Sequence, residues 1–241
     1  MLFSYATARS FRTADTLIAA AGIRVPVIVY GGAFLVEPLT GERLDSRFLE
    51  PADVEVLLAA CDRHGIPPLV YDLGADGLDR IAWVAGEESP SITAYLTSRA
   101  GDPRLGPVGG RRELPVEQVF YLSAIGARGA IDELAAEVRA RLGARVSLVV
   151  QRDTYRAGEF WLEVTAPGAD KATAALALRD RLGAERLVCF GDNANDLPMF
   201  AVADHSVAVA NAIDEVREAA SEVTASNARD GVVSWLEAHR A

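Results

Sequence analysis

The sequence predicts an α/β fold, a doubly wound and mostly parallel sheet with a second, α+β domain inserted into it. Apolar runs of strand length alternate with helical patterns over residues 1–36 and 165–241, which is the order of parallel βαβ units. Between these ends, helices are followed by pairs of strands. The third observation is the buried strand expected at residues 187–190, which ends in a loop of acids and amides. Open α/β sheets place their sites in such loops.

The composition limits the kinds of protein that this chain can be. Its 241 residues, 50% of them hydrophobic, exceed the usual single-domain size of about 150, so we expect one large or two modest domains. The net charge of −10 argues against a nucleic-acid partner, which would need a basic surface. No stretch is long and apolar enough for a membrane span. Cys61 and Cys189 form no C-x-x-C pair, which fits a reducing compartment, and we expect a cytoplasmic protein.

The N-terminal segment predicts strand, helix and strand at residues 2–6, 11–21 and 25–30. The helix has apolar residues at helical spacing and ends at a glycine. The second strand is almost continuously apolar, as in a parallel strand that is covered on both faces. Thr7 follows the first strand, and a hydroxyl at the carboxyl end of a strand can bind a phosphate oxygen. The alternative is a threonine whose hydroxyl is satisfied locally.

The inserted domain is expected between residues 40 and 160, where the strict alternation of strands and helices is lost. We expect helices at 51–64, 91–99 and 131–142, and strands at 68–73, 80–85, 117–124, 145–151 and 160–164. Residues 101–115 are rich in glycine, proline and arginine, and this composition predicts a loop.

Residues 165–241 return to alternating strands and helices. A helix begins at Lys171, where a cation would lie beside the positive end of the helix dipole, so we expect a phosphate or carboxylate partner for it. The alternative is an ordinary exposed lysine. Strands are expected at 206–209 and 222–225, and a last helix at 231–239 with Trp235 turned inward.

The loop after residues 187–190 holds the most specific chemistry in the sequence. Asp192 and Asp196 are four positions apart, with Asn193 and Asn195 beside them, and such hard oxygen ligands suit Mg²⁺. Asp196 also lies where the N-terminal cap of the next helix is expected. The alternative is a solvated turn that ends in a helix cap.

Four segments resemble one known family. Residues 191–199 read G-D-N-A-N-D-L-P-M and resemble the fourth motif of the haloacid dehalogenase (HAD) superfamily, in its Cof-like phosphatase branch. Residues 6–10, A-T-A-R-S, resemble the second motif, which usually reads A-T-G-R. Lys171 resembles the third-motif lysine, and residues 226–232, S-N-A-R-D-G-V, resemble the run before the last helix. The resemblance covers essentially the whole chain.

The resemblance implies an HAD-like core domain at residues 1–39 and 161–241, with an α+β cap domain at 40–160. It also implies a Mg²⁺-dependent phosphatase, a hydrolase whose partners are small phosphorylated metabolites such as sugar phosphates. Asp192 and Asp196 would ligate the metal. The groups that hold the phosphate would be Thr7, Ala8, Arg9, Lys171 and Asn195.

Within that set, Lys171 and Thr7 would be the catalytic residues. Two positions depart from the family pattern. Ala8 replaces the usual glycine, and residues 31–33 read G-G-A where this branch usually has N-G-A. Both departures weaken any inference about the substrate.

The family also begins with a strand that ends in D-x-D-G-T, whose first aspartate is the nucleophile and whose second is the general acid. This sequence begins on the strand of the second motif and contains no D-x-D. Three readings follow: a phosphatase whose sequence starts at an internal methionine, a non-catalytic relative that binds a phosphorylated ligand or a protein, or another reaction such as phosphomutase on the same scaffold.

The missing motif has structural and chemical consequences. We expect the chain as written to be inactive and to bind Mg²⁺ weakly, because the nucleophile and one metal carboxylate are lacking. In the family the first-motif strand lies between the strands expected here at 2–6 and 187–190. We therefore expect those two strands to be either separated or paired directly in a distorted way.

Overall fold

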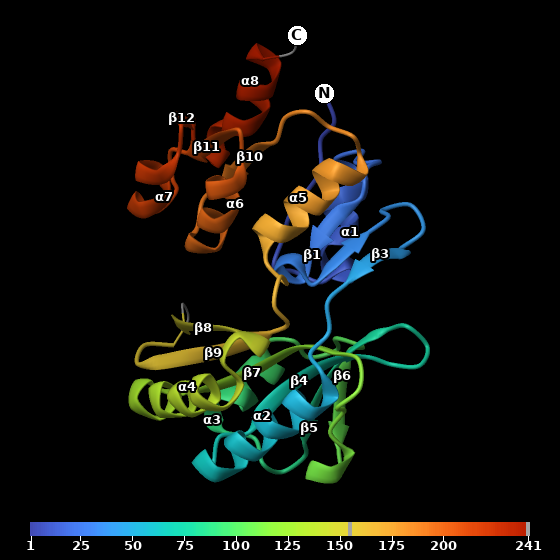
Figure 1. Cartoon of the computed structure of the whole chain (residues 1–241), viewed down its shortest axis with the longest axis vertical. Helices are drawn as coiled ribbons and strands as arrows, with labels where there is room; N and C mark the ends of the chain where they lie inside the picture. The colour runs from blue at the N-terminus through green and yellow to red at the C-terminus, as the bar shows by residue number, and fades with distance from the viewer. Residues whose placement is uncertain (154–155, 240–241) are drawn as a thin grey trace. The chain divides into compact units, whose positions relative to one another are not determined.

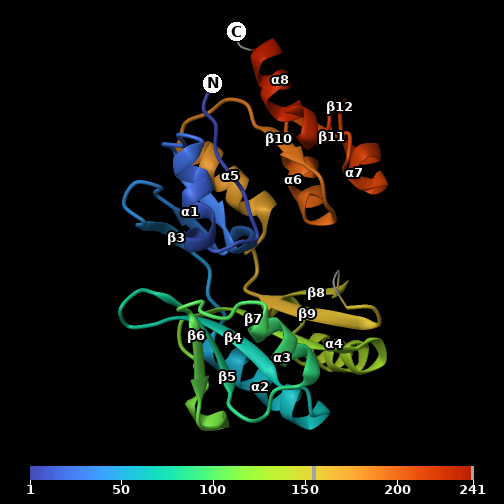
Figure 2. The ribbon, with the colours of Figure 1, turned by 180° about the vertical axis from the view of Figure 1, so that it is seen from behind.

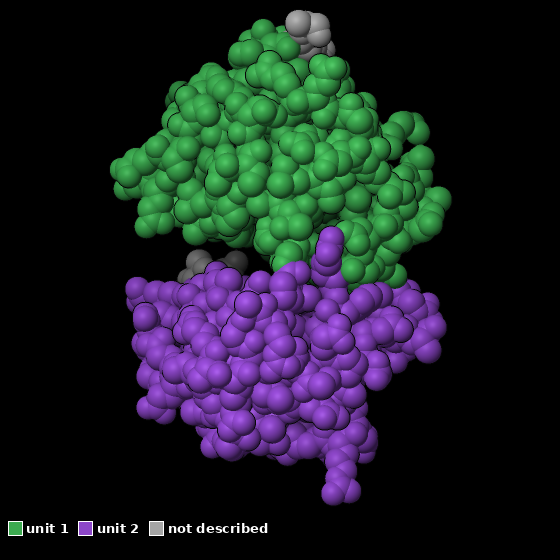
Figure 3. All heavy atoms as spheres, viewed as in Figure 1, with its two compact units in different colours: residues 1–46, 168–241 green, residues 47–167 purple. Residues whose placement is uncertain are grey.

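The computed structural model describes residues 1–153 and 156–239. The chain divides into two compact units, unit 1 with residues 1–46 and 168–241 and unit 2 with residues 47–167 (Figure 3). Both boundaries lie a few residues later than the sequence suggested. Two strands explain the difference, because β3 (Arg43–Ser46) pairs within the sheet of unit 1 and β9 (Glu159–Thr165) within that of unit 2.

Unit 1 contains two three-stranded sheets, and Figure 1 shows its helices beside them. The first sheet is antiparallel, with β1 (Val27–Val29), β2 (Phe34–Val36) and β3 in that order. The second is parallel, with β10 (Val188–Gly191), β11 (His205–Val209) and β12 (Glu222–Thr224). The helices of unit 1 are α1 (Phe11–Ala20), α5 (Lys171–Arg181), α6 (Leu197–Val202), α7 (Asp214–Ala219) and α8 (Gly231–Ala238).

The prediction for the first strand is wrong. Of residues 2–6 only Ala6 makes a bridge, parallel to Ile28, and Leu2 and Phe3 remain 60% and 43% exposed. A β-strand has to pair with a neighbouring strand over several residues, whereas residues 2–6 make one β-bridge only, at Ala6. The predicted helix that follows is confirmed as α1, and the Ser10 hydroxyl caps it by accepting the N–H of Thr13 at 3.1 Å.

Residues 2–6 and β10, which we expected to be either separated or paired in a distorted way, are not paired with each other. In the part of the chain that the structure describes, β10 lies at the edge of its sheet and pairs with β11. Direct pairing between residues 2–6 and β10 is therefore not observed. The two sheets nevertheless share one apolar core, in which Ile28 and Leu35 pack with Cys189 and Ala208.

Unit 2 has one continuous six-stranded sheet, shown from the other side in Figure 2. The strand order is β6 (Leu105–Val108), β5 (Asp79–Val84), β4 (Pro68–Leu73), β7 (Val119–Ala127), β9 and β8 (Ser147–Arg152). Its helices are α2 (Pro51–His64), α3 (Pro90–Thr97) and α4 (Arg128–Leu142). The core of unit 2 joins the apolar faces of α2 and α4 to one face of the sheet. Apart from the loop predicted at 101–115, the strand and helix predictions for this unit are confirmed to within a few residues.

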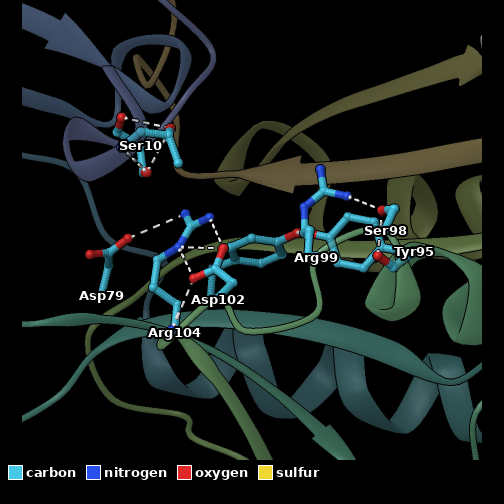
Figure 4. A network of polar contacts seen from close by, with 9 residues as sticks. Ser10, Asp79, Tyr95, Ser98, Arg99, Asp102 and Arg104 are labelled. Carbon is cyan, nitrogen blue, oxygen red and sulfur yellow. Dashed lines mark hydrogen bonds and ion pairs between the residues drawn. The ribbon is translucent and has the colours of Figure 1, made fainter. Parts of the chain in front are cut away.

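The predicted loop at 101–115 contains a strand, β6, which is the main correction in unit 2. β6 pairs in parallel with β5, and Figure 4 shows the arginine that anchors its start. The Arg104 guanidinium lies 2.5 Å from a carboxylate oxygen of Asp102 and 3.5 Å from one of Asp79. This local ion cluster holds the strand in place although its sequence has a weak strand propensity. None of the helices in the described residues has the length and hydropathy of a membrane span.

Candidate active site

The loop between β10 and α6 folds around the carboxylate of Asp196. One oxygen, Oδ2, accepts the backbone N–H groups of Asp192 at 3.0 Å and Asn193 at 3.1 Å. This is the reciprocal half of a capping box in which Asn193 is the cap. Gly191 has to be a glycine, because a Cβ there would lie 2.6 Å from the Cβ of Asp196. The loop geometry therefore depends on Gly191 and Asp196 together.

Lys171 joins this loop from the first position of α5. Its ammonium lies 2.6 Å from Oδ1 of Asp196 and 3.3 Å from Oδ1 of Asn195. The lysine is 7% exposed and Asp196 4%, so this is a buried ion pair. The anion that the helix position of Lys171 predicted is thus a carboxylate of the chain itself. The helix begins on Asp170, whose side chain accepts the N–H of Thr173 at 2.8 Å.

Asp192 is exposed, and no hydrogen bond or ion pair involves its carboxylate within the described residues. Its backbone carbonyl accepts the N–H of Ile213 at 3.1 Å, which ties the loop to the start of α7. The main chain at Asp192 is therefore held in place, and the carboxylate is available to a ligand.

Thr7 lies in a second loop of the site and is 8% exposed. Its Oγ1 accepts the N–H of Arg9 at 3.1 Å, so the local satisfaction that the sequence left open does occur. The hydroxyl hydrogen remains available to donate. Ala8 and Arg9 are exposed.

The turn Tyr30–Gly32 connects the Thr7 loop to the start of α5. The N–H of Gly31 donates to the carbonyl of Thr7 and that of Tyr30 to the carbonyl of Arg9, both at 2.9 Å. A Cβ at Gly32 would lie 2.3 Å from the Asp170 carbonyl oxygen. All three turn residues have positive φ, 49°, 65° and 115°. Gly32, which matches the glycine of the family's N-G-A, is thus the contact point with α5, a role that the sequence did not reveal.

Further positioning contacts tie the loops after the three parallel strands together. The N–H of Asn227 donates to Oδ1 of Asn211 at 2.9 Å, which joins the loops after β12 and β11. Gly231 is the first residue of α8, and it lies so close to the backbone of Ala225 that a Cβ would be 1.8 Å from the Ala225 carbonyl oxygen. The glycine of S-N-A-R-D-G-V therefore has a packing role. Asn211 was missed because a lone asparagine after a strand gives no distinctive signal.

The thiol at the centre of β10 takes no part in this chemistry. Burial, with a smaller contribution from the nearby carboxylate of Asp196, raises the pKa of Cys189 to about 12. The thiol therefore stays protonated at neutral pH and is inert.

The residues fit a magnesium ion in part. Asp192 offers a free carboxylate, whereas both oxygens of Asp196 are already hydrogen-bonded to Lys171 and to the loop. Over the described part of the chain, no three His, Cys, Asp or Glu side chains form a ready-made metal cluster. Mg²⁺ usually keeps several waters and shares one or two carboxylates with substrate phosphate, so this donor set suits it.

Comparison with known proteins identifies relatives of this arrangement. The sequence pattern of haloacid dehalogenase-like hydrolases matches residues 1–236. YitU of Bacillus subtilis, a 5-amino-6-(5-phospho-D-ribitylamino)uracil phosphatase, is 32% identical over 108 residues, which cover 44% of this chain and 40% of YitU. The matched stretch thus spans less than half of that relative.

Two solved structures resemble the whole chain. TM0651 from Thermotoga maritima is 25% identical and covers 100% of this chain, while the match covers 85% of TM0651, with a TM-score of 0.79. A haloacid dehalogenase-like hydrolase from Bacteroides thetaiotaomicron is 23% identical, with 98% and 85% covered and a TM-score of 0.77. The likeness to the second structure shows the fold alone.

Proposed function

Because the chain belongs to the haloacid dehalogenase-like hydrolases, we propose that it forms the phosphate- and metal-binding part of a Mg²⁺-dependent phosphatase of small phosphorylated metabolites. Sugar phosphates and related phosphorylated polyols are the proposed substrates. The observation that carries this proposal is the buried pair of Lys171 and Asp196, next to the free carboxylate of Asp192.

Each residue of the pair has a distinct proposed task. The lysine ammonium has three N–H donors, and Asp196 and Asn195 accept two of them. The third is left for a phosphoryl oxygen. Because the oxygens of Asp196 are occupied, this residue orients Lys171 and reaches a metal through water. Asp192 is the proposed direct ligand of the metal.

The Thr7 loop supplies donors on the other side of the phosphoryl group. The Thr7 hydroxyl accepts from Arg9 and keeps its own hydrogen to donate to a phosphoryl oxygen. The exposed backbone at Ala8 and the guanidinium of Arg9 add positive character to the same loop. When bound, Mg²⁺ supplies charge neutralisation to the equatorial oxygens of the phosphoryl group.

The attacking group has to come from a D-x-D segment, which the 241 residues do not contain. Loss of a covalent nucleophile typically costs about a million-fold in rate. We therefore propose that residues 1–241 alone bind phosphorylated ligands without hydrolysing them. A non-catalytic relative that binds a phosphorylated ligand is the second candidate function, since the Lys171–Asp196 pair and the free Asp192 carboxylate would serve ligand binding there as well.

The test compares the chain with a version that carries a D-x-D-G-T strand ahead of residue 1. With p-nitrophenyl phosphate and hexose phosphates, we expect Mg²⁺-dependent turnover in the extended version and none in residues 1–241. Replacing Asp192→Ala in the extended version should abolish turnover. Metal-dependent hydrolysis by residues 1–241 themselves would contradict the proposal, and an inactive extended version would favour the non-catalytic candidate.

A further inference from the structure

Helix α8 packs on the parallel sheet of unit 1 through a single tryptophan, and Figure 1 shows the helix next to that sheet. Phe190, Val207 and Glu222 are neighbours across β10, β11 and β12. Side chains of residues paired in this way lie on the same face of a sheet. The Trp235 ring of α8 meets the Phe190 ring edge to face, with centroids 5.2 Å apart, so the helix covers this face.

A carboxylate at the start of β12 joins α8 to two strands. The indole N–H of Trp235 donates to Oε2 of Glu222 at 2.9 Å, and Trp235 is only 8% exposed. His205, the first residue of β11, contacts the same oxygen through Nε2 at 3.2 Å. The His205 ring also stacks on the indole, with centroids 5.9 Å apart and planes at 24°. One carboxylate oxygen thus connects β11, β12 and α8.

A second histidine contacts the same tryptophan from the end of the helix. The His239 and Trp235 rings are stacked, with centroids 3.9 Å apart and planes at 12°. Nδ1 of His239 lies 2.8 Å from the Trp235 carbonyl oxygen. His239 follows the last residue of α8, so it lies at the negative end of the helix dipole. Two of the three histidines of the chain therefore contact Trp235.

Both histidine contacts favour the protonated form of the ring. Carboxylate and carbonyl oxygens only accept hydrogen bonds, so His205 has to donate from Nε2 and His239 from Nδ1. A neutral imidazole carries one N–H and can do this in one tautomer only, whereas the imidazolium carries both. The charged ring of His205 also gains an ion pair with Glu222. The charged ring of His239 gains attraction to the helix dipole and to the indole.

The charged groups around the rings leave this preference intact. Hydrogen bonds from Trp235 and then from His205, together with the charges of both histidines, hold the pKa of Glu222 below its usual value. Glu222 therefore stays negative over the range of about pH 5 to 8 in which imidazoles titrate. Asp204 precedes His205, and its carboxylate accepts the N–H of Leu187 at 2.7 Å. In the described part of the chain, no lysine or arginine pairs with these groups, so the only nearby repulsion is between the two imidazoliums.

We propose that His205, His239, Glu222 and Trp235 form a pH-sensitive clasp, which holds α8 on the sheet more firmly when the two imidazoles are protonated. The added stabilisation is present at the acid end of the range of about pH 5 to 8 and is lost as the pH rises through it. Release of α8 at the alkaline end uncovers Phe190 and the apolar face around it.

The test is amide hydrogen exchange of the full 241-residue chain at about pH 5.5 and about pH 8, with each rate divided by the intrinsic rate at that pH. We expect the protection of α8 to be about tenfold higher at the lower pH, since each histidine should contribute about threefold. Protection of α5, in the same unit, should change much less. No change in α8, or an equal change in α5, would overturn the proposal.

Substitutions assign the effect to the two rings. His205→Gln and His239→Asn each keep an N–H donor near the ring nitrogen that donates, but neither new side chain can be protonated. Each should reduce the pH effect on α8 to about threefold, and the double variant should abolish it. The matched control is His64→Gln, at the third histidine, which lies in α2 of unit 2 and should leave the effect on α8 unchanged. An undiminished pH effect in the double variant would refute the assignment.

The indole N–H of Trp235 gives a second readout, which does not depend on the stability of α8. Its NMR signal should follow a titration curve between about pH 5 and 8, because its acceptor Glu222 is shared with His205. Trp235→Phe identifies the signal, since Trp83 and Trp161 lie in unit 2. The signal should stay constant over this range in the double variant. A constant signal in the wild type, or an equal titration in the double variant, would contradict the clasp.

Discussion

The two units arrange their β-strands differently. Unit 2 places six strands in one continuous sheet over one large core, whereas unit 1 divides six strands between two sheets of three. In unit 1, the apolar side chains of Leu2 and Phe3 stay exposed, and residues from both sheets share a smaller core. Unit 2 is thus held by repeated strand pairing. Unit 1 depends more on single close contacts, and those contacts are the ones that build the site.

We expect the largest effect from breaking the buried ion pair of Lys171 and Asp196, which tests whether unit 1 depends on single contacts. Lys171→Met leaves the carboxylate of Asp196 buried without its cation, and breaking a buried pair in this way costs about 3–5 kcal/mol. Hydrogen exchange should become faster in peptides of unit 1, above all in the loop after β10. Peptides from the sheet of unit 2 should keep their protection.

The matched control is Arg179→Met on the same helix, where Arg179 pairs with Asp180 at the surface. An exposed pair contributes about 1 kcal/mol or less, so exchange should hardly change. Equal loss of protection in both units after Lys171→Met would contradict the comparison, since it would mean that the two units unfold as one.

The sequence predicted unit 2 well because its elements are encoded locally. The helix at 51–64 has apolar residues at helical spacing and a proline at its first position, and α2 has the predicted bounds. β6 was missed because its strand state comes from pairing with β5 and from the ion cluster at Arg104. Neither leaves a periodic pattern in the sequence.

In unit 1 the sequence located the chemistry but not all of the backbone that positions it. The loop from Gly191 to Asp196 follows from residue types and spacing, and the carboxylate near Lys171 was expected from helix electrostatics. The strand expected at 2–6 failed, because an apolar run becomes a strand only if partners flank it. The turn at Gly32 was also unpredictable, since its role is a contact with a helix far along the chain.

The second largest effect is expected in the turn Tyr30–Gly32. Gly32→Ala adds a Cβ that would lie 2.3 Å from the Asp170 carbonyl oxygen, at a φ of 115°. Such backbone conformations cost a non-glycine residue about 1–3 kcal/mol, and here the helix must also move away. We expect the loss of stability in unit 1 and weaker binding of inorganic phosphate, measured by thermal unfolding and calorimetry.

Gly22→Ala is the control for the backbone conformation alone, because Gly22 has a φ of 65° and open space around its Cβ position. It should cost about 1 kcal/mol and leave phosphate binding unchanged. If Gly32→Ala behaves like Gly22→Ala, the close approach to α5 does not position Lys171, and the site depends less on tertiary contacts than unit 1 suggests.

The smallest effect concerns the surface of unit 2, where Glu137 of α4 meets α2. Hydrogen bonds from Arg63, and then from Arg141 and His64, lower the pKa of Glu137 from 4.5 to about 2. In the folded chain the carboxylate therefore stays charged at a pH where the unfolded chain protonates it. The stabilisation is fully present above pH 4.5 and is lost as the pH falls toward 2.

Glu137→Gln removes the carboxyl group that titrates, so the pH dependence that it contributes to stability should disappear in this variant. At neutral pH the wild type should have a slightly higher urea midpoint for unit 2 than Glu137→Gln, and the difference should disappear as the pH approaches 2. The matched control is Glu133→Gln, at an exposed position of the same helix outside this ion cluster. Because strand pairing and the apolar core do not titrate, most of the stability of unit 2 should survive the substitution. A large loss of protection across the sheet in Glu137→Gln would show instead that unit 2, like unit 1, depends on a single contact.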